Sequence, residues 1–146
     1  MQVQIKLLND AAKLPAYSKV GDAGLDLVAT SMNITQEYNY GFVEYGTSLA
    51  IKVPEGYVGL IFPRSSISNY GMILANSTAV IDSNYVGELK LRFKYISGTN
   101  AYNIGDRVGQ LIIIPYPTIE FEQVEELPET NRGEAGFGST NTVENG

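Results

Sequence analysis

The 146-residue chain contains no cysteine and no histidine. These absences exclude disulfide bonds, thiolate nucleophiles, imidazole acid–base catalysis and zinc sites built from Cys and His. Any chemistry must therefore use carboxylates, hydroxyls, Lys, Arg or backbone amides. A metal ion would have to be a hard ion held by oxygen atoms, and Mg²⁺ bridging a phosphorylated ligand fits this donor set best.

Basic residues are also few, because 10 Lys and Arg stand against 16 Asp and Glu and give a formal net charge of −6. Long DNA or RNA needs a basic face and is not expected as a ligand, although a small anion can bind where Arg and backbone N–H groups converge. No apolar run approaches the length of a membrane span, and residues 1–6 lack the pattern of a signal peptide. We expect a soluble, cytoplasmic protein.

Helical spacing is nearly absent, and strand periodicity takes its place. Apolar and polar residues alternate in segments 3–7 and 88–95, as in half-buried antiparallel strands. Segments 57–62 and 111–114 are continuous apolar runs, which predict strands covered on both faces in the middle of the core. Only residues 65–70 suit a short helical turn. The predicted fold class is all-β, a sandwich or barrel of short strands.

The length suits one compact domain that buries about two thirds of its unfolded surface. After Pro128 the composition becomes acidic and rich in glycine, too poor in apolar groups to build core. We therefore divide the chain into a β domain, residues 1–128, and a flexible C-terminal arm, residues 129–146. A disordered terminus explains such a segment too. Arg132 and Phe137, however, lie among small residues with free amides and hydroxyls, an arrangement that can close on an anion.

The most informative segment is the predicted hairpin at residues 76–88. Asp82 ends an apolar strand just before a turn at Ser83-Asn84, with Tyr85 beyond it. A carboxylate at such a position is held by packing on one side and open to a ligand on the other, which is where catalytic groups are often found. The alternative is that Asp82 only accepts hydrogen bonds from turn amides.

Phosphate and base contacts are suggested by Gly136-Phe-Gly-Ser-Thr140, whose small residues can turn N–H groups inward, with Arg132 nearby to bind phosphate oxygens. An exposed Phe137 can stack on a nucleobase, a contact that contributes roughly 1 to 3 kcal/mol to binding. The spacing and the Lys of a Walker-type loop are missing. Base and phosphates together indicate a nucleotide.

Three further segments could contribute polar groups. Residues 63–68 place Arg64 and serine hydroxyls after a buried strand, residues 22–27 carry two carboxylates, and residues 105–110 end on Gln110 inside an apolar run. Each also has a structural explanation, as a serine cap, a loop entry and a buried amide that bonds the backbone.

In this order the segments resemble the five motifs of the homotrimeric dUTPases (dUTP nucleotidohydrolases). The motifs are Asp22-Ala-Gly-Leu-Asp-Leu, Pro63-Arg-Ser-Ser, Ala79-Val-Ile-Asp-Ser-Asn-Tyr-Val-Gly-Glu, Gly105-Asp-Arg-Val-Gly-Gln and Arg132-Gly-Glu-Ala-Gly-Phe-Gly-Ser-Thr. The resemblance covers nearly the whole chain. It implies a dUTPase-like β-clip, or distorted jelly-roll barrel, with one short helical turn, and a homotrimer whose sites lie at subunit interfaces and are completed by the arm of another subunit.

The implied reaction is Mg²⁺-assisted hydrolysis of dUTP to dUMP and pyrophosphate, which limits uracil incorporation into DNA and supplies dUMP for thymidylate synthesis. By resemblance, Asp82 is the base that deprotonates a water attacking the α-phosphorus, and Asp26 bonds a water in the shell of a Mg²⁺ held mainly by the triphosphate. No histidine is needed, because phosphoryl transfer relies on positioning and charge neutralisation.

The resemblance also assigns the contacts with dUTP. Asn76 and the hairpin backbone would bond uracil, Tyr85 would exclude a ribose 2′-OH, and Phe137 would stack on the base. The remaining implied contacts, most of them with the phosphates, are Arg64, Ser65, Ser66, Val80, Ile81, Lys90, Gln110, Arg132, Gly138, Ser139 and Thr140. Mismatched polar groups would discriminate against cytosine by a factor of roughly 10⁴ in kcat/KM. Exclusion of the thymine methyl would provide a factor of only about 10 to 200.

Three residues depart from the motifs, because Ala79, Ala135 and Asn141 stand at usual glycine positions. A φ above zero at Ala79 would cost roughly 1 to 2 kcal/mol, so we expect ordinary backbone there.

Three other functions remain open from the sequence. A dCTP deaminase of the same superfold would use a glutamate such as Glu88, a regulatory protein would bind the nucleotide and signal to a protein partner, and a purely structural β-sandwich would do neither.

Overall fold

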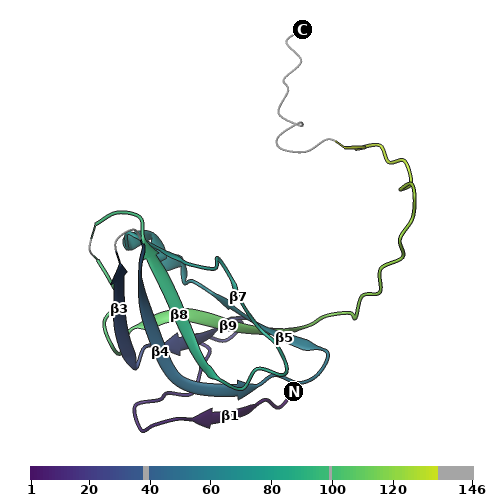
Figure 1. Ribbon diagram of the computed structural model, residues 1–146. Helices are drawn as coiled ribbons and strands as arrows, with labels where there is room; N and C mark the ends of the chain where they lie inside the picture. Colours follow the sequence, from purple (N-terminus) through teal and green to yellow (C-terminus); the bar gives the residue numbers. More distant parts are fainter. Residues whose placement is uncertain (38–39, 99, 135–146) are drawn as a thin grey trace.

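The strands form two antiparallel sheets (Figure 1), and the computed structural model describes residues 1–37, 40–98 and 100–134. The first sheet has the order β1 (Gln4–Leu7), β4 (Tyr40–Lys52), β8 (Glu88–Tyr95) and β6 (Met72–Leu74), and β3 (Ser31–Glu37) also pairs with β4. The second has the order β2 (Leu25–Val28), β9 (Arg107–Pro115), β5 (Tyr57–Phe62) and β7 (Ala79–Ile81). The all-β prediction is confirmed, although the described strands make two open sheets and no closed barrel.

The core lies between the two sheets and follows the alternation in the sequence. On β8, Leu89, Leu91 and Phe93 are buried while the basic residues between them are exposed. Tyr45 of β4 packs edge to face on Phe93, with ring centroids 5.8 Å apart. The period-2 pattern therefore predicted the inward residues of β8 correctly as far as Phe93. It was wrong for Tyr95 and for Leu7 of β1, which lie at the ends of their strands and are exposed.

The prediction of complete burial for the central strands of the second sheet is wrong for the single chain. β5 and β9 do lie at its centre, and their inward residues Ile61 and Leu111 are buried. Their outward residues Leu60 and Ile112, which face each other across the strands, are only half-buried. The chain has no layer of its own among the described residues to cover this outer apolar face.

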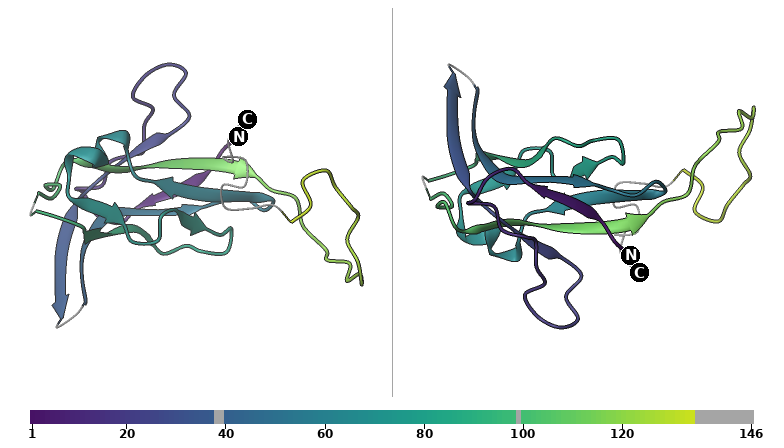
Figure 2. Two further views of the ribbon diagram at one scale, coloured as in Figure 1. Left: turned by 90° about the horizontal axis from the view of Figure 1, so that it is seen from above. Right: turned by 90° about the horizontal axis from the view of Figure 1, so that it is seen from below.

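Two connections position functional residues. The predicted helical turn is present as the 3₁₀ helix η1 (Ser65–Asn69), directly after β5. After β9, residues 116–134 leave the two sheets as an extended segment (Figure 2), and the apolar side chains of Ile119, Phe121 and Leu127 are exposed on it. No helix in the described ranges is long and apolar enough to span a membrane.

Candidate active site

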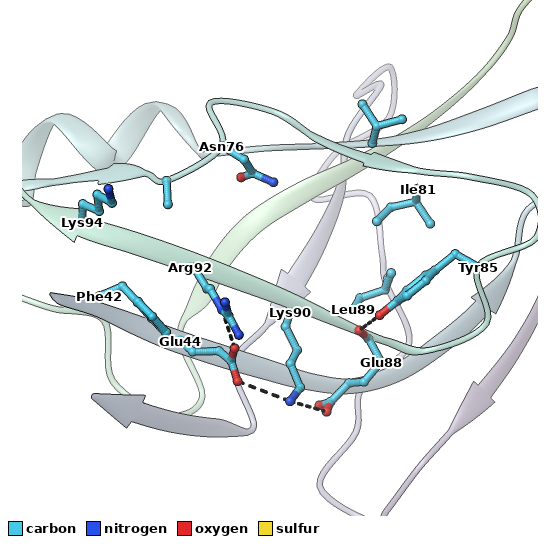
Figure 3. Close-up of a pocket in the computed structure, with 12 residues that line it drawn as sticks. Phe42, Glu44, Asn76, Ile81, Tyr85, Glu88, Leu89, Lys90, Arg92 and Lys94 are labelled. Carbon is cyan, nitrogen blue, oxygen red and sulfur yellow. Dashed lines mark hydrogen bonds and ion pairs between the residues drawn. The ribbon is translucent and has the colours of Figure 1, made fainter. Parts of the chain in front are cut away.

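The predicted hairpin at residues 76–88 is wrong in its pairing, because β7 pairs with β5 in the second sheet whereas β8 pairs with β4 and β6 in the first. The turn after Asp82 instead carries the chain from one sheet to the other. A pocket of about 580 Å³ opens between this crossing segment and the first sheet (Figure 3). It is lined by Phe42, Glu44, Ala75, Asn76, Val80, Ile81, Tyr85, Glu88, Leu89, Lys90, Arg92 and Lys94. The structure therefore brings together five of the predicted contacts, although they come from two different sheets and the connections between them. They are Asn76, Val80, Ile81, Tyr85 and Lys90.

Asn76 reaches the pocket because the chain turns sharply between β6 and β7. Ser77 adopts a left-handed φ of 59°, and its N–H donates to the carbonyl of Leu74 at 3.0 Å. Ala79 follows in ordinary strand geometry, buried and paired with Ile61. The expectation of ordinary backbone at this usual glycine position is confirmed.

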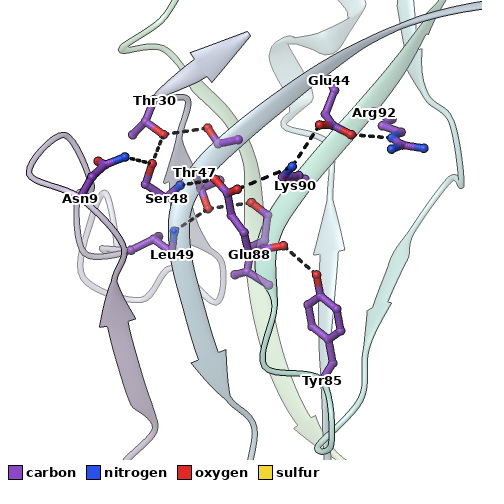
Figure 4. A network of polar contacts seen from close by, with 12 residues as sticks. Asn9, Thr30, Glu44, Thr47, Ser48, Leu49, Tyr85, Glu88, Lys90 and Arg92 are labelled. Atoms are coloured by element: carbon purple, nitrogen blue, oxygen red, sulfur yellow. Dashed lines mark hydrogen bonds and ion pairs between the residues drawn. The ribbon is translucent and has the colours of Figure 1, made fainter. Parts of the chain in front are cut away.

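Tyr85 is fixed at one end of the pocket by its own turn. Its N–H donates to the Asp82 carbonyl at 3.1 Å, and its hydroxyl donates to the Glu88 carbonyl at 2.8 Å (Figure 4). A Cβ on Gly87 would lie 2.6 Å from the phenol oxygen, so only glycine allows this ring position. Lys52 secures the turn from β4 by donating to the Ser83 carbonyl at 2.6 Å.

Asp82 is exposed at the tip of this turn. Of the residues that the structure describes, none donates a hydrogen bond to its carboxylate, so it does not cap the turn amides. The side chain is available for a water molecule or a ligand.

A charge network forms the floor of the pocket. Glu44 accepts hydrogen bonds from Arg92 at 2.7 Å and Lys90 at 3.3 Å, and Arg92 also lies over the Phe42 ring at 4.5 Å from its centroid. The hydrogen bond from Arg92 lowers the pKa of Glu44, and Glu44 in turn raises the pKa of Lys90. Both pKa shifts show that the network stabilises the ionised forms of Glu44 and Lys90.

Glu88 lines the pocket, but its carboxylate points toward β4. One carboxylate oxygen accepts the N–H of Ser48 at 2.8 Å, and the other lies 3.7 Å from Lys90. Ser48 has a left-handed φ of 53° in the stretch where the pairing of β4 with β8 shifts register. Because Glu88 serves this irregular turn, its geometry does not favour the deaminase hypothesis.

A second polar cluster lies at the end of the second sheet near η1. Asp26 accepts hydrogen bonds from Arg64 Nε at 3.1 Å and from Arg107 Nη1 at 3.0 Å. Arg64 Nη1 also lies 3.5 Å from the Ser66 hydroxyl. Gln110, directly opposite Asp26 in the β2–β9 pairing, donates to the Pro63 carbonyl at 3.2 Å. The sequence prediction had assigned Arg64, Ser66 and Gln110 to the phosphates and Asp26 to the metal ion that they bind.

The backbone makes this cluster compact. A Cβ on Gly24 would lie 2.3 Å from the Gln110 side-chain oxygen, so a side chain there would displace the amide. Ser65 is exposed at the start of η1, where first-turn N–H groups have no intrahelical acceptor. The cluster therefore offers guanidinium, hydroxyl and N–H donors on one surface.

The pocket with Asp82 and the polar cluster around Asp26 lie apart in one chain. Ile81, just before Asp82, pairs with Gly59, whereas Gln110 pairs with Phe62, three residues further along β5. Along the strand direction, Ile81 and Gln110 are therefore about 10 Å apart. Across the sheet, β7 lies three strand spacings, about 14 Å, from β2, which carries Asp26. The same chain does not bring Asp82 beside Asp26.

The arm residues complete the predicted set only in part. Arg132 lies in a turn in which the Gly133 N–H donates to the Thr130 carbonyl at 3.0 Å, on the segment that leaves the sheets. Phe137, Gly138, Ser139 and Thr140 lie outside the described residues, as do the departures Ala135 and Asn141.

The donor set for a metal ion is limited. No group of three acidic side chains that could hold a metal ion occurs within the described ranges. Asp26 supplies a single carboxylate, which two guanidinium groups already neutralise. Such a set fits only a hard ion, such as Mg²⁺, that takes most of its ligands from phosphates and water.

Sequence reasoning missed Arg107, Glu44 and Arg92. Arg107 lies inside a recognised motif, and its only signal was a second cation close to the predicted phosphate-binding segments. Glu44 and Arg92 face each other in the β4–β8 register, which no single segment of the sequence reveals.

The dUTPase family model matches residues 10–141. The chain belongs to the dUTPase family. Curated relatives named deoxyuridine 5′-triphosphate nucleotidohydrolase occur in Finegoldia magna, with 38% identity over 94% of this chain and 99% of the relative, and in Acinetobacter baylyi, with 38% identity over 96% and 98%. The predicted family and enzyme class are thereby confirmed.

Solved structures agree with this assignment. A point mutant of the dUTPase of Staphylococcus bacteriophage 80alpha, bound to dUpNHpp, has a TM-score of 0.79 and 28% identity, over 95% of this chain and 98% of that chain. A point mutant of the dUTPase from phage phi11 of S. aureus, described with a structural Mg(II) ion, has a TM-score of 0.72 and 28% identity, over 86% and 98%.

Proposed function

We propose that this dUTPase-family chain hydrolyses dUTP to dUMP and pyrophosphate. The observation that carries the proposal is the pairing of a pocket large enough for a nucleoside, beside the unengaged carboxylate of Asp82, with a separate cluster of phosphate-binding donors around Arg64. The pocket matches the deoxyuridine end of dUTP, and the cluster around Arg64 matches the triphosphate end.

Asp82 acts as the base in this proposal. Its carboxylate orients a water and takes a proton as the water oxygen forms a bond to the α-phosphorus. The bond from that phosphorus to the α,β bridging oxygen breaks, and pyrophosphate leaves. Arg64, Ser65 and Ser66 bind the phosphates, and the Ser65 hydroxyl meets the charge that develops on the α,β bridging oxygen of the leaving group.

Mg²⁺ bound to the triphosphate would neutralise phosphate charge, with Asp26 holding a water of its shell. Arg107 positions the Asp26 carboxylate by binding the oxygen that Arg64 does not use. Gln110 sits beside Asp26 and anchors the Pro63 carbonyl, which holds the η1 turn toward the phosphates.

Selection for deoxyuridine rests on the pocket beside Asp82. Asn76 would bond the uracil edge, and Tyr85, immobilised by its hydrogen bond to Glu88, would exclude a ribose 2′-OH. Val80 and Ile81 add apolar lining, and Lys90 is held by Glu44 at the floor. The arm would close the site through Arg132, Phe137, Gly138, Ser139 and Thr140.

The active assembly in this proposal is a homotrimer with sites between subunits. Two observations support it. Asp82 and Asp26 lie too far apart in one chain to act on one phosphate, and the outer face of the second sheet is apolar, with Val80 60% and Ile114 40% exposed. A second copy can cover this face and bring its own half of the site.

In the cell the reaction would keep dUTP out of DNA and supply dUMP for thymidylate synthesis.

The test is pyrophosphate release from dUTP, dTTP, dCTP and UTP with Mg²⁺, comparing the parent chain with Asp82→Asn. We expect release from dUTP alone, lost in the variant. Retained binding of dUTP without release would replace hydrolysis by a regulatory nucleotide-binding role, and ammonia from dCTP would indicate a deaminase.

A further inference from the structure

Tyr102 is a buried tyrosine directly behind the phosphate cluster, and none of the sequence motifs includes it. Its side chain is 2% exposed. The ring stacks at 4.1 Å between centroids on Tyr70, which follows η1, and contacts Tyr45 and Phe93 at 5.9 and 5.7 Å. These aromatic contacts hold the ring under the η1 turn.

The Tyr102 hydroxyl forms no hydrogen bond of regular geometry with any residue in the described ranges. Burial raises the pKa of this phenol, while the Ser66 hydroxyl and the Arg64 guanidinium lower it, so both groups lie close to its oxygen. Buried hydroxyls without a partner are rare and costly, and this one faces the turn expected to bind phosphate.

We propose that Tyr102 is a positioning residue that donates a hydrogen bond to the Ser66 oxygen when phosphate binds, and so directs the Ser66 proton to a phosphate oxygen. The inference rests on the proposed function of Arg64 and Ser66 as phosphate ligands. It adds a residue that acts through Ser66 and does not itself touch the substrate.

The chemistry of a hydroxyl explains this role. A serine hydroxyl has one proton to donate and two lone pairs that accept. Arg64 Nη1 approaches Ser66 Oγ at 3.5 Å, and a donor from Tyr102 would occupy the second lone pair. With both lone pairs occupied, the Ser66 proton has an anion as its acceptor. Arg64 and Tyr102 thus convert Ser66 into a pure donor toward phosphate.

The experiment compares Tyr102→Phe with Tyr45→Phe in the full chain. Tyr45 is the matched control because it is also a buried tyrosine of the same cluster, but its hydroxyl donates to the Tyr102 carbonyl at 3.0 Å instead of facing Ser66. We expect Tyr102→Phe to raise the KM for dUTP and the Kd for dUpNHpp about fivefold, the range for one net hydrogen bond, with kcat within about twofold. Inhibition by deoxyuridine, which lacks phosphates, should not change.

A double-mutant cycle with Ser66→Ala distinguishes the proposed positioning role of Tyr102 from a merely structural role. In that background Tyr102→Phe should cause no further loss of dUpNHpp affinity, because the hydroxyl acts through Ser66. Additive losses, a matching loss in Tyr45→Phe, or unchanged dUpNHpp affinity in Tyr102→Phe would overturn the inference. A parent chain that releases no pyrophosphate from dUTP would instead overturn the proposed function, since dUpNHpp affinity can be compared without turnover.

Discussion

Arg64 Nε donates a hydrogen bond to Asp26 Oδ1 at 3.1 Å, so the cation proposed to bind phosphate lies against the carboxylate proposed for the Mg²⁺ shell. Arg107 binds the other carboxylate oxygen at 3.0 Å. Binding of a triphosphate with its metal ion must therefore reorganise charges that are already paired. We therefore expect the charge of Asp26, and not only its shape, to matter for the proposed activity.

Asp26→Asn should lower kcat/KM for dUTP by at least about tenfold, because the amide offers one acceptor oxygen to two arginines, turns its NH₂ donor toward the second, and carries no charge for the outer shell. The Mg²⁺ concentration for half-maximal rate should rise in parallel. Asp22→Asn is the control, since Asp22 belongs to the same motif but accepts the Lys19 N–H at 2.7 Å in the preceding loop. Equal effects of the two substitutions would remove Asp26 from its assigned role.

Removal of the Glu88 carboxylate should destabilise the fold. Glu88→Ala leaves the N–H of buried Ser48 without its acceptor, at a cost of about 1 to 3 kcal/mol in the free energy of unfolding. Glu88→Gln retains an acceptor oxygen and should lose much less. Urea unfolding of the two variants measures the difference, and equal stabilities would show that the hydrogen bond to Ser48 contributes nothing.

Acid should weaken the network at the floor of the pocket. The pKa of Glu44 is lowered below its usual 4.5 by the hydrogen bond from Arg92, so the stabilisation is fully present above pH 4.5 and is lost as the pH falls through the lower folded value. Glu44→Gln should therefore flatten the fall of the urea midpoint below pH 4.5. A variant with the same acid profile as the parent chain would exclude Glu44 as its source.

Deletion of residues 129–146 should leave a folded, nearly inactive trimer. The segment extends away from both sheets as far as the structure describes it, so its loss removes no core contact there. Sizing by light scattering and the rate of pyrophosphate release test the two parts separately. Full activity in the truncated protein would refute a closing role for the arm.

The sequence predicted local features well because they depend on neighbouring residues. Alternation along β8, the turn after Asp82 and the short helix after Arg64 are all encoded in consecutive positions. The wrong prediction for β5 and β9 has a physical reason: apolar residues on both faces indicate that both become covered, but not which chain covers them. The distance between Asp82 and Asp26 was likewise invisible, since it depends on the order of strands in the sheet.

The placement of Asp82 and Asp26 at opposite ends of the second sheet has a consequence for mixtures of chains. Asp82→Asn and Asp26→Asn are each expected to lose most of their activity alone. If a site takes Asp82 from one subunit and Asp26 from its neighbour, unfolding and refolding the two variants together in equal amounts rebuilds about a quarter of the sites with both carboxylates intact. The mixed trimers would then be more active than either variant alone. Other pairs of variants could be mixed in the same way to show which site residues come from the same subunit.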